Sequence, residues 1–304
     1  MIYTVTFNPA IDYAIEIDEI NFGETNRAKN TYIYPGGKGI NISRVLNNLE
    51  VESTALGFVG GFTGKYLEDY LDKSEIKTDF IKLDQPTRIN IKLKGQKETE
   101  INASGPNIPD EKIEEFYGKI DELEDGDFLI LAGNIQSSLR RDLYFDIQER
   151  CSEKDIHIIV DTTGEALKKT LANKPFLIKP NVRELEEIFN VDIKGNEEVI
   201  KYAEKLHQKG AENVIVSMGG DGAVLLTTDE VYFAKAPKGE LRNSVGSGDS
   251  MIAGFLSSYT KTKDSLNSFR WAVAAGSATA FSTDLAEKEE VEELLERVNI
   301  ERLK

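Results

Sequence analysis

Hydrophobic and polar residues form two different patterns along this chain. From about Leu56 onward, short apolar runs alternate with longer amphipathic stretches that have helical spacing. The runs at 128–131 and 156–160 are apolar on both faces, as strands covered by helices on both sides are. This repeated strand–helix–strand pattern predicts an α/β fold with a mostly parallel central sheet and helices on both of its faces.

Two segments depart from this strand–helix pattern and predict a small second sheet. Residues 11–34 and 88–103 alternate apolar and polar side chains around turn-rich middles, as half-exposed antiparallel strands do. Because a helix at about 39–48, a strand and another helix are predicted between them, we expect the segments to meet as a small sheet projecting from the main body. This sheet, at about 11–35 and 88–104, suits a lid over a site, an edge extension or a homodimer interface, and a lid can also dimerise.

The last third of the chain predicts three helices, at 248–260, 267–281 and 287–297. The second contains WAVAAGSATAF, which is rich in small residues and includes Ala275 and Ser277. A helix of this kind packs closely against other backbone or against a flat ligand, and the sequence leaves both options open.

The composition favours a globular protein in a reducing compartment. The 304 residues are 40% hydrophobic and 30% charged, and the net charge of −16 argues against nucleic acid or an anionic membrane as the main partner. The single cysteine, Cys151, cannot form an intramolecular disulfide. The first residues, MIYTVTFNP, alternate like a strand rather than a signal peptide, and no apolar run approaches the roughly 20 residues of a membrane span. We therefore expect a cytoplasmic protein.

Several common active-site motifs are absent from the sequence. Neither Gly-Lys dipeptide, at 37–38 or 64–65, has the spacing of a Walker A loop, and no Gly-x-Gly-x-x-Gly fingerprint begins at Gly246. The two histidines, His157 and His207, suggest neither a Ser/His/Asp hydrolase nor a histidine metal centre.

A glycine-rich loop with an acid instead stands at the start of the predicted helix at 248–260. In NSVGSGD, Gly246 and Gly248 let a ligand approach the backbone, and the N–H groups of Ser247, Gly248 and Asp249 are unpaired donors at a positive helix end. Taken alone, Asp249 is more typical of an acid in the first turn of a helix, and it is the other polar, glycine-rich turns at the ends of the predicted strands that favour a site.

A second loop, PGGKGIN, ends the first projecting segment and begins the helix at about 39–48. Its glycines Gly36 and Gly37, with Lys38 and Asn41, could contact a polyol or an anion, although a turn and helix start explain the glycines as well. Further polar candidates on the projecting segments are Asp12, Arg27 and Arg88, each of which has the alternative of a solvated surface charge.

Two more candidates stand at later strand ends. Lys179, Asn181 and Glu184 occupy a strand-to-helix junction, where the Asn–Glu spacing suits a hydrated magnesium ion or, equally, a helix-capping box. The turn VSMGGDG suits either a nucleotide lying on bare backbone or a simple hairpin. Its candidate residues are Ser217, Gly219, Gly220 and Gly222.

Together these motifs resemble the ribokinase-like carbohydrate kinases, the PfkB family, over essentially the whole chain. GGKGIN at 36–41 and NSVGSGD at 243–249 are similar to the two family signatures, with Asn243 and Ser244 where the second usually has Asp and Thr. KPN followed by Glu184 resembles the Asn-x-x-Glu magnesium motif of the family. The resemblance implies one ribokinase-like domain over residues 1–304 that uses ATP and Mg²⁺.

Within the family, the motifs TFNPAID, PGGKGIN and TRIN are most similar to those of members that phosphorylate fructose 1-phosphate, and next to those that use tagatose 6-phosphate. The implied reaction is phosphorylation of fructose 1-phosphate at its 6-hydroxyl, giving fructose 1,6-bisphosphate and ADP. The segment INASGPN departs from the family pattern at the substrate-facing edge of the lid. A sugar-phosphate sensor without turnover is the alternative from another class, and the intact Gly-Ser-Gly-Asp argues against it.

The resemblance also implies a role for each candidate residue. Asp249 accepts the proton of the attacking hydroxyl, and an ordinary pKa suffices because this proton leaves late in a loose transition state. The transferring phosphoryl group is held by Gly246, Ser247 and Gly248. The sugar phosphate is assigned to Asp12, Arg27, Gly36, Gly37, Lys38, Asn41 and Arg88. The nucleotide is assigned to Lys179, Asn181, Glu184, Ser217, Gly219, Gly220 and Gly222, with Ala275 and Ser277 near adenine and with Mg²⁺ held through water by Asn181 and Glu184.

Overall fold

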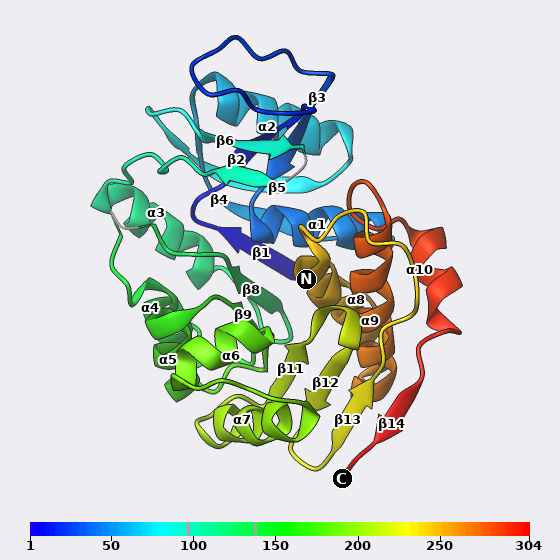
Figure 1. The fold of residues 1–304 in the computed structure, drawn as a ribbon. Coiled ribbons are helices and arrows are strands. Elements are labelled where there is room, and N and C mark those ends of the chain that lie inside the picture. Colours follow the sequence, from blue (N-terminus) through cyan, green and yellow to red (C-terminus); the bar gives the residue numbers. More distant parts are fainter. Residues whose placement is uncertain (96–97, 137–138) are drawn as a thin grey trace.

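The computed structural model describes residues 1–95, 98–136 and 139–304, which form a large and a small sheet (Figure 1). The large sheet has the strand order β14-β13-β12-β11-β10-β9-β8-β1-β4-β5. It is parallel from β11 to β5, while β12, β13 and β14 extend one edge in antiparallel fashion. The predicted α/β fold with a mostly parallel sheet is therefore confirmed. The strands are β1 (Ile2–Thr6), β4 (Thr54–Gly60), β5 (Lys77–Leu83), β8 (Phe128–Ala132), β9 (His157–Asp161), β10 (Leu177–Ile178), β11 (Asn213–Ser217), β12 (Ala223–Leu226), β13 (Val231–Ala234) and β14 (Ile300–Arg302).

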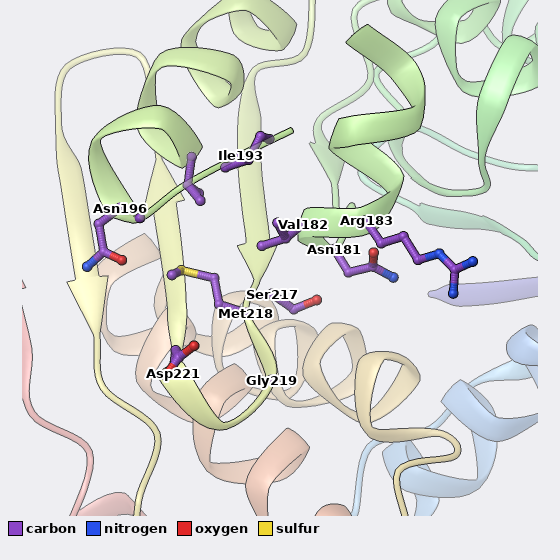
Figure 2. Close-up of a pocket in the computed structure, with 11 residues that line it drawn as sticks. Asn181, Val182, Arg183, Ile193, Asn196, Ser217, Met218, Gly219 and Asp221 are labelled. Atoms are coloured by element: carbon purple, nitrogen blue, oxygen red, sulfur yellow. The ribbon is translucent and has the colours of Figure 1, made fainter. Parts of the chain in front are cut away.

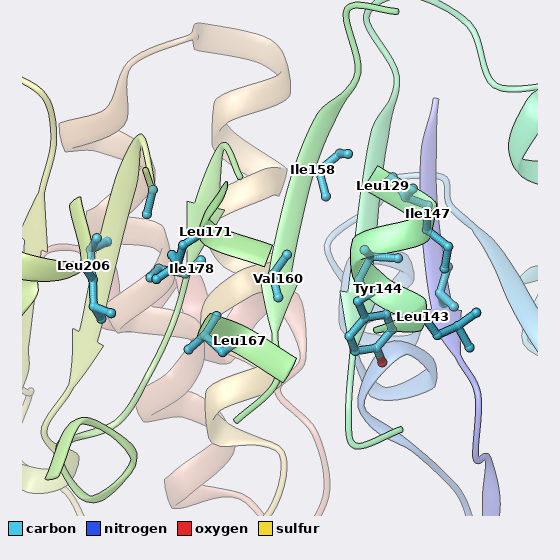
Figure 3. Packing of buried hydrophobic residues seen from close by; sticks show 14 of the residues in the cluster. Leu129, Leu143, Tyr144, Ile147, Ile158, Val160, Leu167, Leu171, Ile178 and Leu206 are labelled. Carbon is cyan, nitrogen blue, oxygen red and sulfur yellow. The ribbon is translucent and has the colours of Figure 1, made fainter. Parts of the chain in front are cut away.

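Helices cover both faces of this sheet because its strands are apolar on both sides. In β8, Leu129 and Leu131 belong to one buried core, whereas Phe128 and Ile130 belong to the other. Figure 3 shows part of the first core, where Leu143, Tyr144 and Ile147 of α4 lie near strand residues. The first core is covered by α3 (Asp110–Asp121), α4 (Leu143–Arg150), α5 (Gly164–Thr170), α6 (Val182–Phe189) and α7 (Asn196–Gln208). The second is covered by α1 (Lys38–Asn48), α8 (Ser247–Thr262), α9 (Ser265–Phe281) and α10 (Lys288–Leu295).

One further helix and two 3₁₀ turns complete the main body. Helix α2 (Gly61–Lys73) packs on β4 and β5 through a smaller apolar cluster. Two 3₁₀ turns, η1 (Leu171–Asn173) and η2 (Gly219–Asp221), follow α5 and β11. In the described ranges, no helix has both the length and the apolar character that crossing a membrane requires.

The small sheet contains the two segments that were predicted to project from the body. It has the order β3-β2-β6-β7, formed by β2 (Ala10–Glu16), β3 (Asn30–Gly36), β6 (Arg88–Lys94) and β7 (Thr99–Ile101). Figure 1 shows it at the top of the molecule, beside α2. We call this sheet the lid. Positions 96–97 of the second predicted segment lie outside the described residues.

The lid combines two kinds of strand pairing. Each segment forms the predicted antiparallel pair, and the central strands β2 and β6 run parallel to each other, a direction that the sequence pattern did not specify. The reason is that β2 and β6 follow closely after β1 and β5, which run in the same direction in the large sheet. Two strands that leave the body in the same direction pair in parallel.

Candidate active site

Charged residues gather where the parallel strands end. Asp161 is the last residue of β9, and Lys179 directly follows β10. The side chain of Lys179 reaches the first turn of α8, because a Cβ placed on Gly248 would lie 2.8 Å from the Lys179 Nζ. In open α/β sheets ligands bind at this edge, so the strand ends and the start of α8 form the centre of the candidate site.

The start of α8 can hold an anion. Gly246, the residue before the helix, has a left-handed φ of 79°, a conformation that favours glycine. The Ser247 hydroxyl donates a hydrogen bond to the Gly276 carbonyl at 2.7 Å and thereby fixes the helix start on α9. Within the described residues, the N–H groups of Ser247, Gly248 and Asp249 have no acceptor. These donors lie at the positive end of the helix, where negative charge is stabilised.

Asp249 is a buried carboxylate in this first turn. Its side chain accepts a 2.8 Å hydrogen bond from the amide of Asn41 on α1. Burial raises the pKa of Asp249, as does the charge of Asp161, and the opposing effects of Lys38, Asn41 and Lys179 leave the pKa at about 6. An ordinary pKa would suffice for a base of this kind, but the pKa of Asp249 is raised because its side chain is buried, which the sequence does not reveal. A carboxylate with this pKa is well suited to accept a proton near neutral pH.

Asp161 organises the charges around Asp249. It is 2% exposed and lies between two lysines, with Lys38 Nζ at 3.0 Å and Lys179 Nζ at 3.4 Å from its carboxylate oxygens. Burial alone would raise the pKa of Asp161, but the two lysines outweigh this effect and lower it. Burial alone would lower the pKa of Lys38, and Asp161 and Asp249 outweigh that effect and raise it. Asp161 and Lys38 therefore both stay charged.

The sequence contained one signal that could have identified Asp161. It is an acid placed directly after the apolar run at 156–160, at the carboxyl end of a buried parallel strand. The same reasoning selects Lys179, which follows the next strand. Applied to every strand end, it identifies Asp161 as well.

The lid carries Asp12 and the glycine loop that leads into α1. Asp12 accepts a 2.9 Å hydrogen bond from Asn90 and lies 3.8 Å from Lys92 Nζ. A Cβ on Gly36 would lie 2.6 Å from the Asp12 carboxyl carbon, so this carboxylate closes over the glycine. Gly37 has a φ of 120° and precedes α1. The loop therefore joins the lid to the helix that carries Lys38 and Asn41 into the centre.

The two predicted lid arginines differ in position. Arg88, at the start of β6, donates to the carbonyl oxygens of Ala103 and Asn8, both at 3.0 Å. Burial lowers the pKa of Arg88, against an opposing effect of Asp12. Arg27 is exposed in the connection between β2 and β3, and among the described residues it has no hydrogen bond or ion pair. The structure does not bring Arg27 to the other candidates within one chain.

A pocket of about 390 Å³ opens beside the centre, between α6, the start of α7 and the end of β11 (Figure 2). Three predicted nucleotide residues line it, namely Asn181, Ser217 and Gly219. Lys179, Glu184, Gly220 and Gly222 are neighbours of the lining residues in sequence. The rest of the lining was not predicted, because apolar positions at helical spacing indicate core as readily as a pocket. It consists of Val182, Arg183, Ile193, Gly195, Asn196, Val199, Met218 and Asp221.

Asn181 and Glu184 form a helix-capping box, which is one of the two arrangements that their spacing predicts. The Asn181 side chain accepts from the Glu184 N–H, and the Glu184 carboxylate accepts from the Asn181 N–H, both at 2.9 Å. The box uses one carboxylate oxygen of Glu184 and leaves the other free to accept from a metal-bound water. In the part of the chain that the structure describes, no cluster of three or more acidic, histidine or cysteine ligands exists. The donor set thus fits a hydrated Mg²⁺ rather than one enclosed by protein ligands.

The small residues of α9 mainly allow close helix packing. Ala275 is fully buried, and its Cβ would lie 2.7 Å from a Cβ on Gly254 of α8. Ser277 is 9% exposed, and neither residue lines the pocket. Gly222 is similarly confined, since a Cβ there would lie 2.0 Å from the Ala234 carbonyl oxygen. The structure therefore does not bring Ala275 or Ser277 to the predicted nucleotide site.

The chain matches the family model described as "pfkB family carbohydrate kinase" over residues 3–291. It is 49% identical over 303 residues to a 1-phosphofructokinase of Bacillus subtilis, covering all of both chains. It is 42% identical to a 1-phosphofructokinase of Borreliella burgdorferi, covering 99% of this chain and 98% of the relative. A tagatose-6-phosphate kinase of Staphylococcus epidermidis is 35% identical and covers 84% of each chain.

A solved structure of similar fold agrees with this result. The crystal structure of a putative phosphofructokinase from Staphylococcus aureus has a TM-score of 0.90 and 44% identity, covering 100% of this chain and 99% of that one. Its likeness extends over the large sheet and the lid alike. With a matching family model over nearly the whole length and close relatives over all of it, this chain belongs to the pfkB family of carbohydrate kinases.

Proposed function

We propose that this chain catalyses the 1-phosphofructokinase reaction, in which the γ-phosphoryl group of ATP passes to the 6-hydroxyl of fructose 1-phosphate. The observation that carries the proposal is the buried Asp249 beside three N–H donors of α8 that have no acceptor among the described residues. The full-length likeness to 1-phosphofructokinases supports the choice of acceptor.

In this reaction the 6-hydroxyl oxygen forms a bond to the γ-phosphorus, and the bond from that phosphorus to the β–γ bridging oxygen breaks. Asp249 accepts the hydroxyl proton, and ADP leaves. The N–H groups at the start of α8 and the ammonium groups of Lys38 and Lys179 stabilise the charge on the transferring group. Magnesium, held through water by Asn181 and Glu184, would neutralise charge on the nucleotide phosphates.

The pocket beside the centre is the proposed site of the nucleotide base. Its walls include Val182, Ile193, Val199 and Met218, which offer an apolar surface to a flat ring. Asn181 lines this pocket and stands two residues after Lys179, which contacts the first turn of α8. A nucleotide base in the pocket would therefore direct its phosphates along this strand end toward Asp249.

Release of ADP with a panel of ketose phosphates tests the proposed reaction. We expect the highest kcat/KM with fructose 1-phosphate, and lower values with tagatose 6-phosphate and fructose 6-phosphate. A clear preference for tagatose 6-phosphate would reject the assigned acceptor while keeping the kinase. Sugar-phosphate binding without ADP release from any acceptor would instead favour the sensor.

We also propose a homodimer formed through the lid. The register of the lid places its apolar side chains on one face, and Ile33, Ile89 and Ile101 remain 40%, 40% and 55% exposed. The opposite face carries Asp12 and Asn90. A second copy offers the same apolar face, and the two can cover each other about a twofold axis.

Light scattering tests the lid dimer. We expect the mass of a dimer for the native chain and the mass of a monomer for Ile33→Asp, because a charge on each side of the axis opposes the contact. The matched control is Leu303→Asp, since Leu303 is 39% exposed but lies outside the lid. A native monomer, or an Ile33→Asp variant with unchanged mass, would reject the dimer.

A further inference from the structure

A second group of buried polar atoms lies at the base of the lid, outside the catalytic centre. Gln136, after β8, is only 8% exposed, and among the described residues neither atom of its amide has a hydrogen-bond partner. The same holds for Asn8 Oδ1, between β1 and β2, and for Arg88 Nε, at the start of β6. Three separate segments therefore bring unpaired polar atoms to one region.

Gly105 shows that these atoms converge. A Cβ on Gly105 would lie 2.1 Å from Asn8 Oδ1 and 2.3 Å from Gln136 Oε1, so both amide oxygens pack against the side of Gly105 that carries no side chain. Arg88 joins the group, since it donates to the carbonyl oxygens of Asn8 and Ala103. We call the group of Asn8, Arg88, Gly105 and Gln136 the lid-side pocket.

The lid-side pocket is close to the catalytic centre but separate from it. Gln136 follows Gly133 by three residues, and the Gly133 N–H donates to the backbone carbonyl of Asp161 at 3.0 Å. A Cβ on Gly133 would lie 3.9 Å from the Cβ of Lys38. The loop that carries Gln136 therefore starts next to Asp161 and Lys38, and we take the substrate to lie with one end at Asp249 and the other against Gln136 and Arg88.

Unpaired buried donors and acceptors cost free energy unless a ligand completes them. The donors, Arg88 Nε and Gln136 Nε2, suit a phosphate, whereas the acceptors, Asn8 Oδ1 and Gln136 Oε1, need a hydroxyl that donates. The ligand must therefore carry a phosphate and a hydroxyl side by side at this end.

Ketose 1-phosphates and ketose 6-phosphates differ in whether they meet this requirement. In furanose fructose 1-phosphate with its 6-hydroxyl at Asp249, the far end carries the phosphate on C1 and the anomeric hydroxyl on the adjacent C2. In a ketose 6-phosphate with its 1-hydroxyl at Asp249, the far end carries the phosphate on C6, and the adjacent C5 has the ring oxygen but no hydroxyl. Only the 1-phosphate offers both groups that the lid-side pocket can pair.

We propose that Gln136, together with Asn8, is a specificity-determining residue that accepts a hydrogen bond from the anomeric hydroxyl and so selects ketose 1-phosphates over 6-phosphates. This inference rests on the proposed function, because it takes fructose 1-phosphate as the acceptor. Arg88 and the Gln136 amide N–H hold the adjacent phosphate, which both classes of substrate possess.

The test compares fructose 1-phosphate with 2,5-anhydromannitol 1-phosphate, which lacks the anomeric hydroxyl. For the native enzyme we expect kcat/KM to be about tenfold or more higher with fructose 1-phosphate. In Gln136→Leu this ratio falls toward one, because the variant loses one of the two acceptors for the anomeric hydroxyl. The simultaneous loss of the phosphate donor affects both substrates alike and leaves the ratio unchanged. Gln136→Glu keeps an acceptor, so it retains the native ratio while KM rises for both substrates through repulsion of the phosphate.

Gln148→Leu is the matched control. Gln148 on α4 is also buried with both amide atoms unpaired among the described residues, but it lies outside the lid-side pocket, so the native ratio should persist. A native enzyme that does not distinguish the two substrates overturns the proposal even if Gln136→Leu fails to fold. An unchanged ratio in folded Gln136→Leu overturns it too, whereas absence of turnover with fructose 1-phosphate rejects the proposed function instead.

Discussion

The catalytic centre and the lid-side pocket are both buried and polar, but they differ in how their atoms are paired. In the centre, Asp161 binds two lysines and Asp249 accepts from Asn41. In the lid-side pocket, the amide of Gln136 has no partner among the described residues. The charged side chains of the centre are thus paired before substrate arrives, and only the N–H groups at the start of α8 are left for it among the described residues, whereas the side chains of the lid-side pocket are paired only by substrate.

The difference follows from the cost of burying each kind of group. A buried charge without a partner is very unfavourable, so a centre that must be charged has to carry its own counter-charges. A neutral amide costs much less free energy when it is buried without a partner, so it can remain unpaired until a ligand binds. We therefore expect changes in the centre to alter kcat, stability and pH dependence, and changes in the pocket to alter mainly KM.

The largest effect is expected for Asp249→Asn. The variant keeps the shape of the side chain but cannot accept the proton, so kcat should fall by about a hundredfold or more while fructose 1-phosphate still binds in a calorimeter. Asp110→Asn is the control, because Asp110 is also in the first turn of a helix but is exposed. A kcat within tenfold of the native value would remove Asp249 from the role of base.

Asp161→Asn should mainly reduce stability, since it leaves the buried Lys179 and the partly exposed Lys38 without their carboxylate. We expect a loss of about 3–5 kcal/mol in the free energy of unfolding at pH 7, measured with urea. The pKa of Asp161 is lowered on folding from its ordinary 3.8. Its contribution is therefore present above that value and is lost as the pH falls through the folded pKa, so the difference between native and variant should shrink in acid.

The control for Asp161 is an exposed ion pair. Asp192 lies 3.3 Å from Lys194 with both side chains largely in solvent, so Asp192→Asn should cost less than about 1 kcal/mol. Equal losses in the two variants would show that the Asp161 network is not the preorganised element of the centre.

The pH dependence of the native enzyme should report Asp249. Because the base must be deprotonated and its pKa is about 6, kcat/KM should fall about tenfold per pH unit below that value. The charge of Asp161 raises this pKa, so the acidic limb should move to lower pH in Asp161→Asn. An acidic limb at the same pH in both enzymes would assign it to another group.

The same difference in pairing explains what the sequence could predict. The strand and helix pattern, the lid segments and the glycine loops at Gly36 and Gly246 follow from local spacing. The parallel β2–β6 pair, the burial of Asp249 and the position of Asp161 depend on how distant segments meet, and local spacing does not contain that information. Ala275 illustrates the same limit, since a small residue on a helix suits a flat ligand and the close approach of Gly254 equally well.

The smallest expected effect, that of Gly105→Ala, tests most directly whether the lid-side pocket and the centre act independently. Gly105→Ala places a methyl group between the Asn8 and Gln136 amide oxygens, which must move apart and lose alignment with the substrate hydroxyl. We expect KM for fructose 1-phosphate to rise about three- to tenfold, the equivalent of one weakened hydrogen bond, with kcat nearly unchanged. Gly118→Ala on α3 has no neighbour within 4 Å and should leave both constants unchanged. If Gly105→Ala instead lowered kcat and left KM unchanged, the lid-side pocket would act on the chemical step, and the two regions would form one preorganised centre.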